Sequence, residues 1–157
     1  MSTFEEIKND IQEIVSRAEE VIAPKLAPVR EIIEEIKRAL VRGTDTIPTS
    51  RIQDWALSLS IYNAELFPHK EAYSLASALW KIEINNSNAK SLAERRAEQK
   101  KAEIETLNVL NSRDKETQKI IIDYMSSMIR GAQDSIGQMC SELNRILDAR
   151  NWNREAK

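Results

Sequence analysis

Apolar residues in the first part of the chain recur at steps of three and four, the spacing of a helix with one buried face. One such stripe covers residues 4–22 and a second covers 29–42, with Gly43 placed to end the second helix in a left-handed conformation. Pro24 and Pro28 interrupt the pattern, because proline lacks an amide donor and crowds the preceding turn. The pattern predicts two helices joined at a proline-marked bend, forming either a hairpin or one kinked rod.

Residues 43–50 read GTDTIPTS, a run of small polar residues with a glycine and a proline that is typical of a loop. Ser50 and Gln53 then form a capping box, which predicts the start of a third helix. Phe67 and Pro68 are expected to end that helix or bend it sharply, since the residue before a proline avoids the helical region.

Residues 71–111 contain no proline or glycine and can run as one helix. Their apolar stripe gives way to the polar run of residues 85–88, Asn-Asn-Ser-Asn. A helix of ~40 residues is ~60 Å long, whereas a compact domain of this size has a radius of gyration near ~15 Å. The helix therefore either breaks near residues 85–88 or projects and needs a partner.

Residues 111–114 are the predicted turn into a last helix over 115–150, which would pack antiparallel to the helix before it. Apolar residues of this last helix follow a near-heptad seam, and its three methionines suit an adaptable interface. We predict that the following residues of the seam form an oligomer or partner interface: Met125, Met128, Ala132, Ile136, Met139 and Leu143.

These elements predict an all-α protein, a long-helix hairpin or helical bundle with an N-terminal two-helix extension, which assembles into an oligomer. The expected division is a helical extension over 1–42, a linker over 43–50 and a helical assembly domain over 51–157. The composition agrees, because 31% charged residues, 5% aromatics, 3 glycines and 4 prolines are typical of long helices with solvated faces.

Catalytic chemistry is not indicated. His69 is the only histidine and Cys140 the only cysteine, and no metal-ligand spacing or glycine-rich phosphate loop occurs. Cys140 fits a small buried hydrophobe better than a reactive thiol. The acidic N-terminus is unlike a signal peptide, and no apolar run reaches the ~20 residues that span a bilayer. We expect a protein of the cytoplasm that is not an enzyme, needs no metal or other cofactor and does not bind membranes.

A basic run stands out because the whole chain carries a net charge of −2. Five basic and two acidic residues between positions 90 and 101 give a local charge of +3. Such a run can neutralise phosphates without reading sequence, or it can be a solvated face whose glutamates form ion pairs along the helix. The candidate nucleic-acid-binding residues are Lys90, Arg95, Arg96, Lys100 and Lys101.

The second half of the chain resembles the UvsY-like recombination mediators of tailed phages over about residues 69–157. The matching pieces are Leu79-Trp80-Lys81, the segment Arg95-Arg96-Ala97-Glu98-Gln99-Lys100-Lys101 and the amphipathic helix of residues 121–150. The resemblance implies a small helical protein that forms rings and binds single-stranded DNA. It also implies that the protein helps load a RecA-type recombinase onto strands covered by single-strand-binding protein, in the cytoplasm of a bacterial host.

A helical protein-binding module is the alternative, such as a phage inhibitor of a host defence system or a structural adaptor. Its contact surfaces would be the acidic first helix and the methionine-lined last helix. A coiled-coil scaffold with neither activity is the third possibility.

Overall fold

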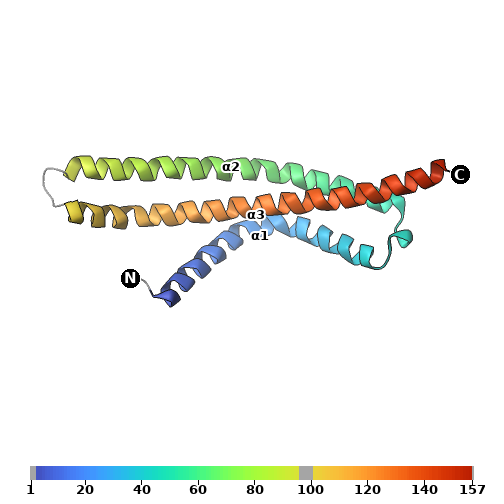
Figure 1. Cartoon of the computed structure of the whole chain (residues 1–157), viewed down its shortest axis with the longest axis horizontal. Helices are drawn as coiled ribbons and strands as arrows, with labels where there is room; N and C mark the ends of the chain where they lie inside the picture. Colours follow the sequence, from blue (N-terminus) through green and yellow to red (C-terminus); the bar gives the residue numbers. More distant parts are fainter. Residues whose placement is uncertain (1–2, 96–100, 157) are drawn as a thin grey trace. The chain divides into compact units, whose positions relative to one another are not determined.

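A computed structural model describes residues 3–95 and 101–156, and it describes side chains for residues 3–86 and 115–156. Within these ranges the chain forms three long α-helices, one 3-10 helix and no strand (Figure 1). The elements are α1 (Phe4–Val41), η1 (Thr44–Thr46), α2 (Thr49–Arg95) and α3 (Lys101–Glu155). The all-α prediction is confirmed.

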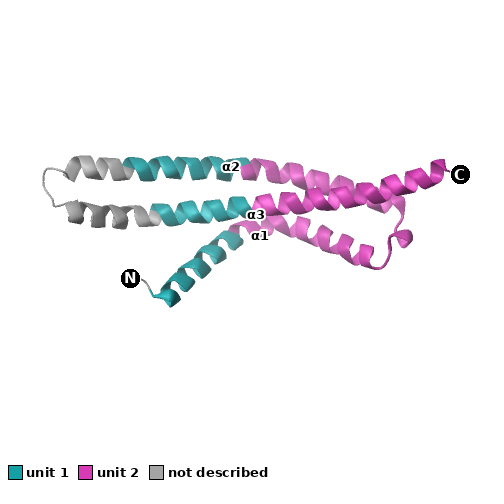
Figure 2. Cartoon of the chain, in the orientation of Figure 1, with its two compact units in different colours: residues 1–20, 71–127 teal, residues 21–70, 128–157 magenta. Residues whose placement is uncertain are grey.

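The helices divide into two compact units (Figure 2). Unit 1 comprises Met1–Glu20 and Glu71–Ser127, and unit 2 comprises Val21–Lys70 and Met128–Lys157. Each long helix thus contributes one part to unit 1 and another to unit 2. The predicted division into an extension, a linker and an assembly domain remains a prediction.

The first correction concerns α1, which runs without interruption through Pro24 and Pro28. Both prolines are exposed, so the carbonyls that lose an amide partner can be hydrated. On the other side of the helix a stripe with steps of four and three is buried: Ile22, Leu26, Val29, Ile33 and Ile36. Of the two predicted alternatives the hairpin is therefore wrong, since residues 4–41 are assigned to one helix, as a single rod requires.

α2 is also longer than predicted. It continues through Pro68, whose side chain is exposed, and through the asparagine-rich residues 85–88 to Arg95. Neither the predicted end at Phe67 and Pro68 nor the break at residues 85–88 occurs. Asparagine is only a modestly poor helix former, which a long packed helix tolerates.

The predicted turn at residues 111–114 is wrong as well, because these residues lie inside α3. The sequence Asn-Ser-Arg-Asp has no glycine or proline, so nothing in it forces the chain to reverse. The reversal instead falls between Arg95, where α2 ends, and Lys101, where α3 begins.

Polar contacts in unit 1 establish that α2 and α3 are antiparallel. The Ser77 hydroxyl donates a hydrogen bond to Asp123, and the Lys115 Nζ lies 2.8 Å from the Glu83 carboxylate. Residue numbers along α3 therefore fall as those along α2 rise. This confirms the predicted antiparallel pairing of the last two helices.

Among the described side chains, more apolar residues are buried in unit 2 than in unit 1. The stripe of α1 is accompanied by buried residues from the two other helices and from the loop after η1. These are Ile47, Ile52, Trp55, Leu59, Leu66, Ile129, Ile136, Leu143 and Ile146. Repeated four- and three-residue steps on the helices are typical of bundle packing. Ile129 is fully buried, although the predicted seam of α3 does not include it.

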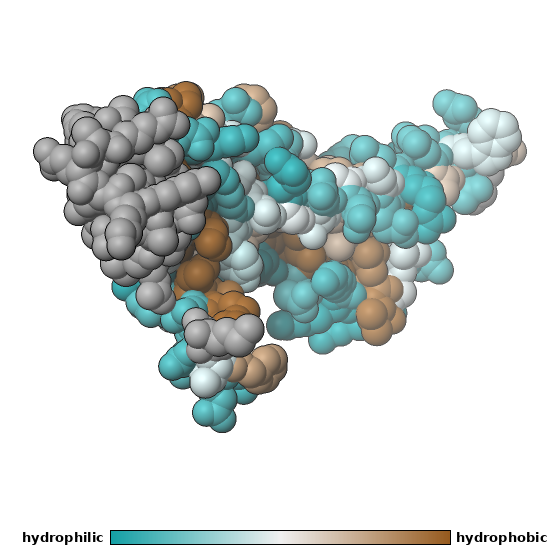
Figure 3. Space-filling view, turned by 60° about the vertical axis from the view of Figure 1, so that its left-hand side comes forward, coloured by the Kyte–Doolittle hydropathy of each residue, from teal (hydrophilic) through white to brown (hydrophobic). Residues whose placement is uncertain are grey.

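Unit 1 buries fewer of its described side chains. Its buried apolar side chains, each less than one-tenth exposed, are Ala18, Ile84, Ile121 and Met125. Several large apolar side chains of the same unit are about half exposed or more. These residues are Phe4, Ile7, Ile11, Leu75, Leu79, Ile82 and Ile120. Figure 3 shows hydrophobic patches on the otherwise hydrophilic face of the chain in that view.

Two leucines two residues apart on α2 test the position of the unit 2 core. Leu59 is fully buried, whereas Leu57 is 62% exposed. We expect Leu59→Ala to lower the free energy of unfolding by about 2–5 kcal/mol through lost burial and a residual cavity. Leu57→Ala should change it by less than about 0.5 kcal/mol. Urea denaturation followed by circular dichroism measures both, and equal effects would contradict the assigned core.

Candidate functional site

Three of the five predicted nucleic-acid-binding residues lie in described helices. Lys90 and Arg95 belong to α2 and Lys101 begins α3, while Arg96 and Lys100 lie outside the described residues. The side chains of all five fall outside the described part of the chain. Their role in binding stays a prediction.

The six residues of the predicted interface fall into two groups. Met125, Ile136 and Leu143 are buried within their own units. The other three are half-buried and line a cavity of about 760 Å³ between α1 and α3 of unit 2: Met128, Ala132 and Met139. Leu26, Val29 and Ile33 of α1 form the apolar part of the facing wall. Whether this seam binds a partner remains a prediction.

Unit 2 also contains a groove that sequence reasoning missed, here called the arginine groove. It has a volume of about 900 Å³ and lies between the C-terminal end of α1 and the start of α2. Four arginines line it: Arg30, Arg38, Arg42 and Arg51. Ala39, Ile47, Pro48 and Trp55 provide its apolar surface, and Glu31, Glu34 and Glu35 its acidic side chains.

One wall of the groove is fixed by a three-residue contact between α1 and α2. Glu35 forms an ion pair with Arg51 and also accepts a hydrogen bond of 3.2 Å from the Trp55 indole nitrogen. The Arg51 guanidinium lies 5.4 Å from the centre of the Trp55 ring, within the range of a cation–π contact. Because Trp55 is buried, this arrangement holds Arg51 against a rigid support.

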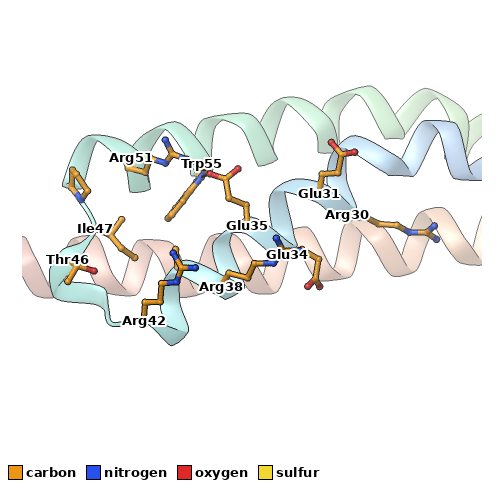
Figure 4. Close-up of a pocket in the computed structure, with 12 residues that line it drawn as sticks. Arg30, Glu31, Glu34, Glu35, Arg38, Arg42, Thr46, Ile47, Arg51 and Trp55 are labelled. Carbon is orange, nitrogen blue, oxygen red and sulfur yellow. Dashed lines mark hydrogen bonds and ion pairs between the residues drawn. The ribbon is translucent and has the colours of Figure 1, made fainter.

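The opposite wall carries Arg38 and Arg42, which are one helical turn apart on α1 (Figure 4). Neither has a hydrogen bond or ion pair with another described residue. Glu34 bonds to Lys37 at 3.2 Å, and Figure 4 shows the Glu31 side chain directed away from both arginines. Two guanidinium groups are therefore available to a ligand.

The loop between α1 and α2 determines how the two walls meet. Gly43 has a φ of 114°, a conformation that glycine adopts without the steric penalty of a side chain. Arg150 of α3 then holds the loop from outside, donating to the Thr44 carbonyl at 2.6 Å and to the Thr49 hydroxyl at 3.0 Å. The start of α2 is thereby fixed relative to the end of α1.

Sequence contained only part of the signal for this groove. The spacing of Arg38 and Arg42 puts them on one face of a helix, and Gly43 indicates that the chain turns directly afterwards. Arg51 follows within the next helix. The partners Glu35 and Trp55, however, are 20 residues apart in sequence, so their contact required the packed structure.

A polar cluster in unit 1 joins α2 to α3. Asp123 accepts hydrogen bonds from Ser77 and from the Lys119 Nζ, the latter at 2.6 Å. Partial burial acts to raise the pKa of Asp123, but these two hydrogen bonds and the positive charge of Lys119 outweigh it. The pKa of this carboxyl therefore lies below its ordinary value.

The remaining reactive groups form no cluster. The Cys140 thiol is half-buried, and burial raises its pKa, which leaves it protonated and weakly nucleophilic. His69 lines a small cavity together with Pro24, Tyr62 and Glu65. No cysteine is in the lining of this cavity, so His69 has no thiol there to activate. Within the described ranges no group of three histidine, cysteine, aspartate or glutamate side chains could hold a metal ion.

None of the described helices combines the length and hydrophobicity needed to cross a bilayer.

Comparison with the models of known protein families, with curated proteins and with solved structures finds no match for this chain.

The Asp123 cluster predicts a stability change in acid. Because the folded-state pKa is lowered, the contribution is present above the ordinary carboxyl pKa and is lost as pH falls through the folded value. Both side chains of the Asp123–Lys119 pair keep substantial exposure, so solvent screening limits the contribution to about 0.5–1 kcal/mol.

Thermal unfolding between pH 7 and pH 2.5 measures this effect. Asp123→Asn should be less stable than the unmodified chain at pH 7 and should lose less of its stability in acid. Asp134→Asn, at an exposed site on the same helix, is the matched control and should keep the original pH profile. Identical profiles for all three proteins would contradict the assignment.

Proposed function

We propose that this protein is an oligomeric recombination mediator of the UvsY-like kind, which binds single-stranded DNA without sequence preference. DNA would be bound by the basic run Lys90–Lys101, and the protein would assist the loading of a RecA-type recombinase. The observation that supports this most is the position of the chain reversal. Since α2 ends at Arg95 and α3 begins at Lys101, the basic run occupies the end of an antiparallel helix pair.

The end of a helix pair suits binding to a flexible strand. Basic residues on both sides of a reversal can contact successive phosphates, and a single strand can bend to reach them. Contacts of this kind release counterions, so affinity should fall steeply with salt. With three to five phosphates neutralised, the slope of log K against log salt would be about −2 to −4.

Assembly is supported by an exposed apolar face on α2 in unit 1. Leu75, Leu79 and Ile82 follow steps of four and three, and each is at least 55% exposed. Ile84, the buried residue of the same segment, faces the other side of the helix. We propose that this face packs against a second copy of the chain, because its helical spacing is that of a bundle contact.

The same face supports the second candidate function, a helical protein-binding module. An apolar stripe with helical spacing can accept an amphipathic helix from a different protein as well as from a copy of itself. A monomeric chain without affinity for DNA would favour this candidate, with an inhibitor of a host defence system or a structural adaptor as its possible roles.

Charge reversal tests the DNA site. We expect the triple substitution Arg95→Glu, Arg96→Glu and Lys100→Glu to weaken binding of a labelled 20-nucleotide oligothymidine by more than about tenfold at low salt, because each removed cation loses a phosphate contact. Fluorescence anisotropy at several salt concentrations measures both affinity and slope.

The matched control for this experiment is Lys8→Glu, Arg130→Glu and Arg154→Glu, which changes the net charge equally at three exposed positions. It should weaken binding by less than about threefold, since it alters only the long-range field. Absence of binding by the unmodified chain, or equal losses in the two triple variants, would rule out the DNA site.

Light scattering tests the assembly face. One chain has a mass of 18.0 kDa, and we expect the mass measured for the unmodified protein in solution to be a multiple of this value. Leu75→Ser with Leu79→Ser should shift the mass towards one chain, because each leucine that leaves an apolar contact costs about 1.5–3 kcal/mol. Leu57→Ser, at an equally exposed site in unit 2, should leave the mass unchanged. A monomeric unmodified chain would refute this proposal.

A further inference from the structure

The arginine groove has no role in the proposed DNA binding, and its construction raises the question of what it binds. Arg38 and Arg42 have no partner among the described residues, and Arg51 of the same groove is held by Glu35 and Trp55. Guanidinium groups present planar forks of donors that match the oxygens of phosphates and carboxylates. An anion is therefore the ligand that this chemistry selects.

The glutamates of the groove limit which anions can bind. Glu35 is paired with Arg51 and Glu34 with Lys37, whereas Glu31 and Arg30 are in the lining without a partner among the described residues. A ligand with one carboxylate would gain little against this background. A diphosphate concentrates more negative charge in a small volume, and two neighbouring phosphates can each meet one of two arginines placed one helical turn apart.

Size and apolar surface restrict the ligand further. About 900 Å³ is within the range of small-molecule sites and exceeds what inorganic phosphate needs. Apolar surface beside the guanidinium groups comes from Ala39, Ile47 and Pro48. The planar guanidinium groups can themselves stack on a planar ring of a ligand. The groove thus offers one part suited to phosphates and another suited to a less polar group.

We propose that the arginine groove binds a phosphorylated small molecule of the size of a nucleoside diphosphate, with its phosphates on Arg38 and Arg42. Arg51 lines the groove as the partner of Glu35, and its salt bridge and ring contact keep it in place before the ligand arrives. Arg150 acts as a positioning residue, because it fixes the loop that sets the distance between the two walls.

Isothermal titration calorimetry at low salt tests the proposal on the full chain, with ADP, pyrophosphate and adenosine as separate probes. ADP and pyrophosphate should bind, and adenosine should not. Arg38→Gln with Arg42→Gln should weaken ADP binding by about tenfold or more, since a hydrogen bond to a charged group contributes roughly that factor. The affinity of the Arg38→Lys, Arg42→Lys variant for ADP should lie between those of the unmodified chain and the glutamine variant. Lysine keeps the positive charges but loses the planar, two-pronged donor geometry of the guanidinium group.

Arg130→Gln is the matched control, an exposed and unpartnered arginine of unit 2 outside the groove, and it should bind ADP within about twofold of the unmodified chain. Since Arg38 and Arg42 are exposed, the glutamine variant should keep its helical circular dichroism and melting temperature. No heat with ADP at millimolar concentration, equal binding by the glutamine variant, or binding of adenosine as tight as that of ADP would overturn the proposal.

The oligothymidine experiment separates this site from the proposed DNA site. The triple variant at Arg95, Arg96 and Lys100 should still bind ADP, and the Arg38/Arg42 variant should still bind oligothymidine. If the Arg38/Arg42 glutamine variant no longer binds oligothymidine and the unmodified chain does not bind ADP, the groove binds the phosphates of a nucleic-acid backbone. The small-molecule proposal is then wrong.

Discussion

Burial of one continuous face of α1 is the constraint on which unit 2 depends. Ile22, Leu26, Val29, Ile33 and Ile36 all fall on this face with regular steps of four and three. A break at Pro24 or Pro28 would turn part of the stripe away from the core. Each interior proline costs about 3 kcal/mol, whereas each fully buried isoleucine, leucine or valine gains about 1.5–3 kcal/mol, so the packed stripe outweighs the prolines.

The same balance explains how much of the fold the sequence could predict. Helical periodicity correctly indicates an all-α chain and the antiparallel pairing of α2 and α3, because these follow from which residues must be buried. The predicted helix end at Pro68 was wrong, since a local breaker decides an end only where tertiary packing does not oppose it. The predicted turn at residues 111–114 was wrong because that segment contains no glycine or proline. Ile129 was missed because the predicted near-heptad seam was placed through Met128, the residue before it.

The two candidate sites also differ in how far they could be predicted from the sequence. The basic run of residues 90–101 could be found by counting charges, because its members are close together along the chain. The arginine groove combines side chains from two helices, and Arg150 stabilises its loop from about a hundred residues further along the chain. No periodicity relates these positions. Composition and spacing can thus identify a continuous patch, whereas a groove between helices requires the packing to be known.

The two units differ in what their apolar residues can do. In unit 2 three helical segments contribute to a shared apolar core, and the arginine groove adds a charged surface, although Leu57, Phe67 and Trp152 remain exposed. In unit 1 the described part keeps Leu75, Leu79 and Ile82 at the surface beside a small core. Burying them against a partner would release water from apolar surface at no further cost in backbone order, because α2 is already helical. The proposed association through unit 1 would thus draw on the same hydrophobic effect that stabilises the core of unit 2 within one chain.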